Sequence, residues 1–149
     1  MQMQKIVPFL WFDDKAEEAA KFYVSVFKNS KMGTVRRYRD AGPGPKGAVM
    51  SAEFQLEGQN FIALNGGPQF TFTPAISFFV NCETQQAGGK PDRCGWLQDK
   101  FGPSWQIIPT ALGKLMGDRD PKKAGRVMKA MLQMNKIDIE GLEQAHKEQ

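Results

Sequence analysis

Short runs dominated by apolar residues recur along the first 109 residues, and runs of about four to eight residues are typical of β-strands. One longer segment, Lys15–Phe27, instead repeats alanine and aromatic residues at intervals of three and four, which predicts a helix. Asp14 and Glu17 stand at the spacing of a capping box at its start. The strands expected are Lys5–Phe12, Gly33–Arg39, Val49–Leu56, Asn60–Leu64, Ala75–Asn81, Cys94–Leu97 and Ser104–Ile108.

After residue 109 the pattern becomes helical. Thr110–Met116 predicts a short helix, and Asp120 followed by Pro121 is a strong signal for the start of the next one. That helix is expected over Lys122–Met134, and a last one over Asp138–Glu148. We therefore expect a domain over residues 1–109 and a C-terminal helical extension over 110–149 that packs on it.

The domain has one layout twice, namely a strand, a crossover and a meander of strands. The first module covers about residues 1–70 and the second about 71–109, and they match in layout but not in sequence. This predicts an α+β fold. The second crossover is short, and Gly88, Gly89 and Pro91 prevent a helix like that of the first module, so this helix is missing near residues 86–87.

Two explanations of the short crossover stay open. The protein has lost its second helix, or about ten residues between Gln86 and Ala87 are absent from the 149-residue sequence. The second explanation is preferred, because an uncovered sheet face would be costly.

Composition and charge exclude several classes of protein. The net charge of +4 comes from scattered basic residues, whereas nucleic-acid-binding proteins cluster them on one face. No apolar run reaches the length of a membrane span and no signal peptide is evident, so we expect a soluble, cytoplasmic protein that binds neither nucleic acid nor membranes.

Two cysteines, Cys82 and Cys94, are too few for a disulfide framework or a zinc site. The single histidine, His146, lies near the C-terminus and disfavours nucleophile–histidine catalysis.

Aromatic residues with a few neutral polar neighbours are the remaining candidates for a binding site. The hairpin Cys94–Pro109 places one amide among large apolar residues, and such a pattern is typical of a small-molecule pocket. The same residues also fit an ordinary core with satisfied polar groups, and this alternative stays open. Reactive chemistry at Cys94 is not expected, because no nearby group lowers its pKa. The candidate ligand-binding residues are Trp11, Asn65, Ser77, Trp96, Trp105 and Gln106.

Several motifs together resemble a known family. They are Pro8–Asp13, Ala16–Tyr23, Ala63–Pro68, Val80–Thr84, Cys94–Gly102 and Ser104–Gln106. In these stretches the chain resembles the PhnB-like proteins, many of which are labelled 3-demethylubiquinone-9 3-methyltransferase. They belong to the vicinal oxygen chelate, or glyoxalase/bleomycin-resistance, superfamily. The resemblance implies two βαβββ modules that form an open, cup-shaped barrel, usually in a homodimer.

The resemblance also implies where the metal ligands of related enzymes would fall. The corresponding positions are Pro8 or Leu10, Ala63 or Asn65, Ala75 or Ser77, and Gln106. Only the neutral amide Gln106 resembles a ligand, so we expect no metal and no other cofactor. Methyl transfer finds no support either, because the glycine-rich stretches do not lead into a helix as a methyl-donor site of the doubly wound kind would need.

Three functions remain compatible with the sequence. The first is binding of a small organic molecule in an aromatic cup without a metal, with or without catalysis. The second is an enzyme acting on a small or quinone-like substrate through Gln106, Asn65 and Ser77. The third is a dimeric scaffold whose helical tail meets a partner. Catalytic residues are not assigned, and a small-molecule ligand and a second copy of the chain are the expected partners.

Intact-mass spectrometry tests the short crossover. If residues are absent between Gln86 and Ala87, the natural protein is heavier than the 16.7 kDa of this sequence. A measured mass equal to 16.7 kDa would instead establish that the helix has been lost.

Overall fold

Two compact units make up the computed structural model, residues 1–71 and residues 72–149. The structure describes residues 4–82, 90–91 and 95–148. Each unit contains a four-stranded mixed sheet, so the α+β class expected from the sequence is confirmed. The division into a domain over 1–109 and an extension over 110–149 stays a prediction.

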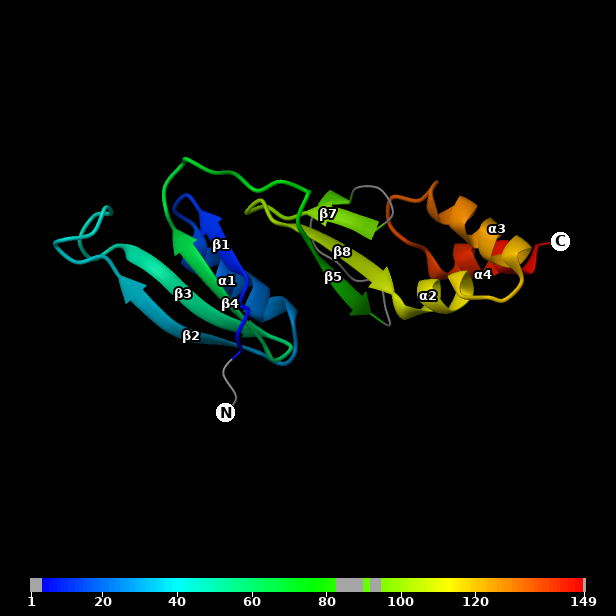
Figure 1. The fold of residues 1–149 in the computed structure, drawn as a ribbon, viewed down its shortest axis with the longest axis horizontal. Helices are drawn as coiled ribbons and strands as arrows, with labels where there is room; N and C mark the ends of the chain where they lie inside the picture. The colour runs from blue at the N-terminus through cyan, green and yellow to red at the C-terminus, as the bar shows by residue number, and fades with distance from the viewer. Residues whose placement is uncertain (1–3, 83–89, 92–94, 149) are drawn as a thin grey trace. The chain divides into compact units, whose positions relative to one another are not determined.

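The first unit is a strand, a helix and three further strands (Figure 1). Its sheet has the order β1-β4-β3-β2, with β1 parallel to β4 and the other pairs antiparallel. The expected strand Lys5–Phe12 is shorter than predicted, whereas the strand Val49–Leu56 has the predicted bounds. The elements are β1 (Phe9–Phe12), α1 (Ala16–Val26), β2 (Ser30–Arg37), β3 (Val49–Leu56) and β4 (Gln59–Asn65).

Helix α1 packs against one face of this sheet. Its buried side is made of three alanines and Tyr23, and small side chains allow a helix to lie close to a sheet. Tyr23 contacts Phe54, whose ring stacks on that of Phe61 at a centroid distance of 5.3 Å. Alternate residues of β1 and β4, including Leu10 and Ala63, point to this same face and are buried.

The N-terminus of α1 differs from the prediction. The capping residue is Lys15 rather than Asp14, and no side chain of the expected capping box bonds to the helix end. The amide oxygen of Asn65, at the end of β4, accepts a hydrogen bond from the backbone N–H of Ala16 at 2.8 Å. A side chain distant in sequence thus supplies the cap that was predicted from Asp14, because the end of β4 lies beside the end of β1.

The second unit repeats the strand order of the first. Its strands are β5 (Ser77–Cys82), β6 (Lys90–Pro91), β7 (Trp96–Gln98) and β8 (Ser104–Pro109), in the order β5-β8-β7-β6. Strands β5 and β8 are parallel and β7 is antiparallel to β8. The predicted loss of a helix near residues 86–87 and the prediction for Cys94 lie outside the described residues.

Three helices follow β8 and lie together in Figure 1. They are α2 (Thr110–Met116), α3 (Pro121–Met131) and α4 (Ile139–Lys147). Helix α2 has the predicted bounds, and the side chain of Asp120 caps α3 as expected. Ile108 of β8 joins Leu112, Val127, Ile137 and Leu142 in one buried cluster, so this helical core is continuous with the sheet of the same unit. Within the described residues, no helix combines the length and the apolar character needed to cross a membrane.

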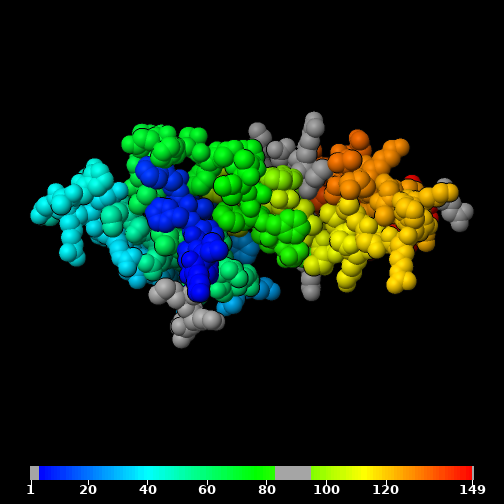
Figure 2. Space-filling model, viewed as in Figure 1, coloured from blue at the N-terminus to red at the C-terminus, as the bar shows by residue number. Residues whose placement is uncertain are grey.

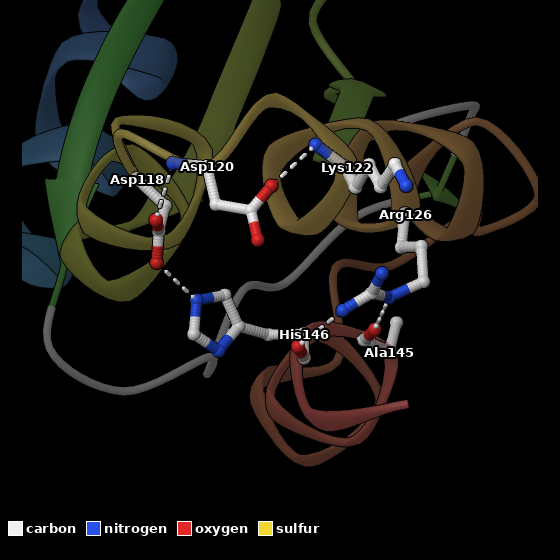
Figure 3. A network of polar contacts seen from close by, with 6 residues as sticks. All are labelled: Asp118, Asp120, Lys122, Arg126, Ala145 and His146. Atoms are coloured by element: carbon white, nitrogen blue, oxygen red, sulfur yellow. Dashed lines mark hydrogen bonds and ion pairs between the residues drawn. The ribbon is translucent and has the colours of Figure 1, made fainter. Parts of the chain in front are cut away.

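A polar network ties the ends of these helices together (Figure 3). Nε2 of His146 in α4 lies 2.7 Å from Oδ2 of Asp118, which follows α2. The guanidinium of Arg126 in α3 donates to the backbone oxygens of Ala145 and His146, two carbonyls in the last turn of α4. The backbone N–H of Asp120 and the His146 side chain bond to Asp118 and hold the pKa of its carboxyl below the usual range.

The helix-capping role of Asn65 gives a stability prediction. Asn65→Ala removes the acceptor for the Ala16 N–H and a donor to the Val49 carbonyl at 3.1 Å. We expect the free energy of unfolding to fall by about 1–2 kcal/mol in urea titrations followed by circular dichroism. Asn29→Ala, at an exposed position after α1, is the matched control and should change it by less than about 0.5 kcal/mol. Equal stability of the two variants would contradict the cap.

The lowered pKa of Asp118 gives a pH-dependent prediction. A carboxyl whose pKa is lower in the folded state stabilises that state above the pKa of the unfolded chain, and this stabilisation is lost as pH falls through the folded value. Asp118→Asn should therefore be less stable than the wild type at about pH 5, and the difference should shrink by about pH 2. Urea unfolding at both pH values measures it. Asp40→Asn, which removes an exposed ion pair with Lys46, should show a small difference at either pH. A pH-independent difference for Asp118→Asn would rule out this role.

Candidate functional site

Two neighbouring residues of β8 point to opposite faces of the second sheet. Trp105 lies on the buried face, with 6% of its surface exposed, and its ring is 5.0 Å from that of Phe78. Its indole Nε1 donates to Oδ2 of Asp99 at 2.7 Å. Because side chains alternate along a strand, Gln106 lies on the other, open face. Of the two residues, only Gln106 is placed to meet a ligand there.

The turn between β7 and β8 is held by Asp99. Its Oδ1 accepts hydrogen bonds from the backbone N–H groups of Phe101 at 2.7 Å and Gly102 at 3.1 Å. Gly102 has a φ of 115°, a conformation that glycine adopts far more easily than other residues. This turn fixes the register in which Trp96 of β7 faces Gln106 of β8.

Three of the predicted site residues meet on the open face. Nε2 of Gln106 donates to Oγ of Ser77 at 2.9 Å, and Trp96 is the antiparallel partner of Gln106. On its other side Gln106 is paired with Phe79 of β5, which is 56% exposed. Gln106 therefore lies between two aromatic residues across three strands, and β5 reaches the molecular surface in Figure 2. Sequence reasoning missed Phe79, although its spacing of two from Ser77 places both on one face.

The polar groups of this face have unused hydrogen-bonding capacity. Within residues 4–82, 90–91 and 95–148, neither the Gln106 Oε1 nor the Trp96 indole N–H has a hydrogen-bond partner. Over the same ranges, the second N–H of Gln106 and the hydroxyl hydrogen of Ser77 also have no acceptor. The three strands β5, β7 and β8 contain no charged residue. The face thus offers neutral donors and acceptors between aromatic rings.

Trp11 and Asn65 belong to the first unit and lie on opposite faces of its sheet. The indole Nε1 of Trp11 donates to the Gly67 backbone oxygen at 2.9 Å, and its ring meets Phe70 edge-on at 5.0 Å. The Asn65 side chain is used at the start of α1 and on β3, and its backbone oxygen accepts from the Tyr38 hydroxyl at 2.6 Å. Both residues have structural partners, and their assignment to a ligand stays a prediction.

A hollow of about 730 Å³ lies in the first unit and was not predicted. Carboxylates from the start of α1 line it, together with Tyr38 and the loops around Gly44 and Gly66. Glu17 pairs with Lys21 at 2.9 Å, and this hydrogen bond lowers the pKa of the Glu17 carboxyl. Glu18 pairs with Lys15 at 3.4 Å. The acidic residues after β1 and the Asn65-Gly-Gly-Pro stretch were the available sequence signals. Because several of its polar groups have partners inside the unit, the hollow is a weaker candidate than the open face.

The positions implied for a metal offer few metal-binding groups. Of the alternatives at the first two positions, Leu10 and Ala63 are apolar and buried in the core, with 7% and 0% of their surfaces exposed. The register puts Trp11, not Leu10, on the opposite face of β1. Ser77 and Gln106 offer only neutral groups, which bind divalent transition metals weakly. Among the described residues, no group of three or more His, Cys, Asp or Glu side chains could hold a metal ion.

Cys82 is a thiol on the far side of the same sheet from Gln106. It alternates with Asn81, whose pairing partner Ile108 shares the face of Gln106. Burial raises the pKa of the Cys82 thiol, so it is protonated at neutral pH and is a poor nucleophile. Covalent chemistry at this residue is therefore disfavoured.

Comparisons with known proteins agree with this fold. The PhnB protein of Bacillus cereus is 40% identical, covers 72% of this chain and 100% of its own, and superposes with a TM-score of 0.62. The protein PA1353 of Pseudomonas aeruginosa is 16% identical over 72% of this chain and 98% of its own, with a TM-score of 0.53, and shares the fold. A search of curated proteins gave no match.

The family assignment follows from the sequence as well as from the fold. The family model described as 3-demethylubiquinone-9 3-methyltransferase matches residues 4–108, which include both sheets except for Pro109, the last residue of β8. The resemblance of the sequence motifs to PhnB-like proteins is thereby confirmed. This chain belongs to the 3-demethylubiquinone-9 3-methyltransferase, PhnB-like family.

Proposed function

We propose that this protein binds a small, neutral, aromatic molecule on the open face of β5, β7 and β8, without a metal. One observation carries the proposal. Gln106 and Ser77 form a hydrogen-bonded neutral pair between Trp96 and Phe79, and toward the described residues both keep unused donors or acceptors. Ligand sites commonly combine aromatic walls with a few polar groups of this kind.

The aromatic residues supply the attraction. An exposed Phe79 and a half-buried Trp96 leave apolar surface in water, and a planar ligand that covers it gains about 25 cal/mol per Å² of apolar area removed from water. Stacking on an aromatic ring adds about 0.5–1.5 kcal/mol. Together these terms suit a flat molecule of moderate size.

The absence of charge in these strands selects a neutral ligand. A charged group on the face would lose hydration without meeting an opposite charge from β5, β7 or β8. A neutral molecule avoids this cost, and its polar atoms can bond to Gln106, Ser77 and the Trp96 indole.

The family description names a methyl transfer. It is not part of the proposal, since the loop around Gly44 leads into strand β3 and not into a helix.

The proposal concerns binding alone, and the remaining predictions about site residues, catalysis, assembly and location are not part of it. Trp105 supports the site from the buried face, while Trp11 and Asn65 stabilise the first unit. Catalysis on a quinone-like substrate has no base or nucleophile on the open face to carry it, as far as the described strands extend. The cup-shaped arrangement of the modules, the homodimer and the cytoplasmic location stay predictions.

Indole N–H signals in a ¹H–¹⁵N correlation spectrum test the site. The three tryptophans give one signal each, and Trp96→Phe assigns that of Trp96. Addition of naphthalene-carboxamide should shift the Trp96 signal most, since the N–H groups of Trp11 and Trp105 already have protein acceptors. Calorimetric titration should show at least about tenfold weaker binding of naphthalene-carboxylate and naphthylmethylammonium, which share the ring but carry charge.

Paired variants locate the bound molecule. Trp96→Leu should weaken binding of naphthalene-carboxamide about tenfold, while Trp11→Phe should leave it unchanged. Loss of binding in Trp11→Phe alone would place the ligand in the first unit and overturn the proposal. No binding by the wild-type protein would favour a scaffold role, and self-association that depends on Phe79 would identify the face as a contact between two copies.

A further inference from the structure

We infer that the ligand presents an N–H donor and a C=O acceptor side by side, as a lactam does. This inference rests on the proposed binding face and goes further by naming the chemical class. It is carried by the state of the Gln106 side chain, whose amide bonds to Ser77 at one end and has no partner at the other within the described part of the chain.

The geometry of an amide group sets the pattern. The carbonyl oxygen and the N–H₂ of glutamine lie in one plane on adjacent positions, so their complement is a second planar group with an N–H and a C=O side by side. The 2.9 Å hydrogen bond to Ser77 Oγ uses one N–H and fixes the direction of the amide. Oε1 and the second N–H then have no partner among the described residues.

Other neutral groups satisfy this pattern less well. A phenol donates to Oε1 but is a weak acceptor for the N–H, while an isolated ketone accepts and cannot donate. A carboxylic acid has both functions when protonated, but near pH 7 it loses its proton, its donor and its neutrality. A lactam fused to an aromatic ring keeps both functions at neutral pH and supplies the flat surface for Trp96 and Phe79.

The neighbouring residues support the same pairing. Gln106 is flanked by Phe79 and Trp96 through direct strand pairing, so a ring lying over these residues brings its polar edge to the Gln106 amide. The hydroxyl hydrogen of Ser77 offers a further donor to a lactam carbonyl, which has two lone pairs. Ser77 is thus a positioning residue for the amide as well as a donor.

Carbostyril and its N-methyl derivative are probes that differ at the lactam nitrogen, where a methyl group replaces the hydrogen of the donor. For the wild-type chain we expect carbostyril to bind about tenfold more tightly in calorimetric titrations, since the methyl compound leaves Oε1 unpaired. In Gln106→Leu, which keeps the size of the side chain and removes its polar atoms, the two compounds should bind within about twofold of each other. Gln98→Leu is the matched control in β7, where the amide bonds to the Gly102 backbone oxygen, and it should retain the tenfold preference.

The outcomes separate this inference from the proposed function. If both probes bind equally to the wild type and shift the Trp96 indole signal, the face binds aromatic molecules but the lactam inference is wrong. If carbostyril is preferred and the preference persists in Gln106→Leu, the methyl group is excluded by shape and the pairing with Gln106 is again wrong. If neither probe nor naphthalene-carboxamide binds, the proposed function fails together with the inference. Circular dichroism of each variant checks that it is folded.

Discussion

The hydrogen bond from the Trp105 indole to Asp99 sets the register of the β7–β8 hairpin, and the candidate site depends on that register. The same carboxylate accepts two backbone N–H groups of the turn, so one side chain orders both the turn and the strand. A slip of one residue would turn Trp105 toward the open face and bury Gln106. An unpaired buried amide costs about 1–3 kcal/mol, which opposes the slip. The open face is therefore a consequence of how its opposite face is packed.

The two units use one strand order and complete it differently. In the first, Asn65 at the end of β4 turns back to cap α1, and the helix covers the sheet. In the second, β8 occupies the position of β4 in the order, and the chain continues from its end directly into α2. Ile108 enters the helical core only two residues beyond Gln106. The C-terminal helices thus pack against β8, the strand that contains Gln106. This contact connects the helices to the candidate site, so a separate function for the helices is not required.

Local sequence patterns predicted the elements well and the partnerships poorly. Val49–Leu56 and Thr110–Met116 were predicted with the bounds that they have, because their apolar periodicity is uninterrupted. The capping box at Asp14 was wrong because the competing acceptor, Asn65, is remote in sequence and adjacent only after β1 pairs with β4. In the same way, the alternation of side chains along β8 places Trp105 and Gln106 on opposite faces of the sheet. Only the packing of Trp105 on Phe78 decides which of the two faces is buried. Sequence alone therefore selected Ser77, Trp96 and Gln106 without showing that they meet on one face of the second sheet and that Trp105 lies on its other face.

Selectivity at such a face has to come from hydrogen bonding and shape. The chain carries a net charge of +4, yet none of its charged residues lies in β5, β7 or β8. Aromatic stacking is tolerant of ligand identity, since any flat ring gains similar contact. A neutral hydrogen bond contributes only about 0.5–1.5 kcal/mol when formed, but a buried polar atom without its partner costs about 1–3 kcal/mol. In the proposed binding mode, Gln106 therefore discriminates mainly by rejecting molecules that leave its amide unpaired.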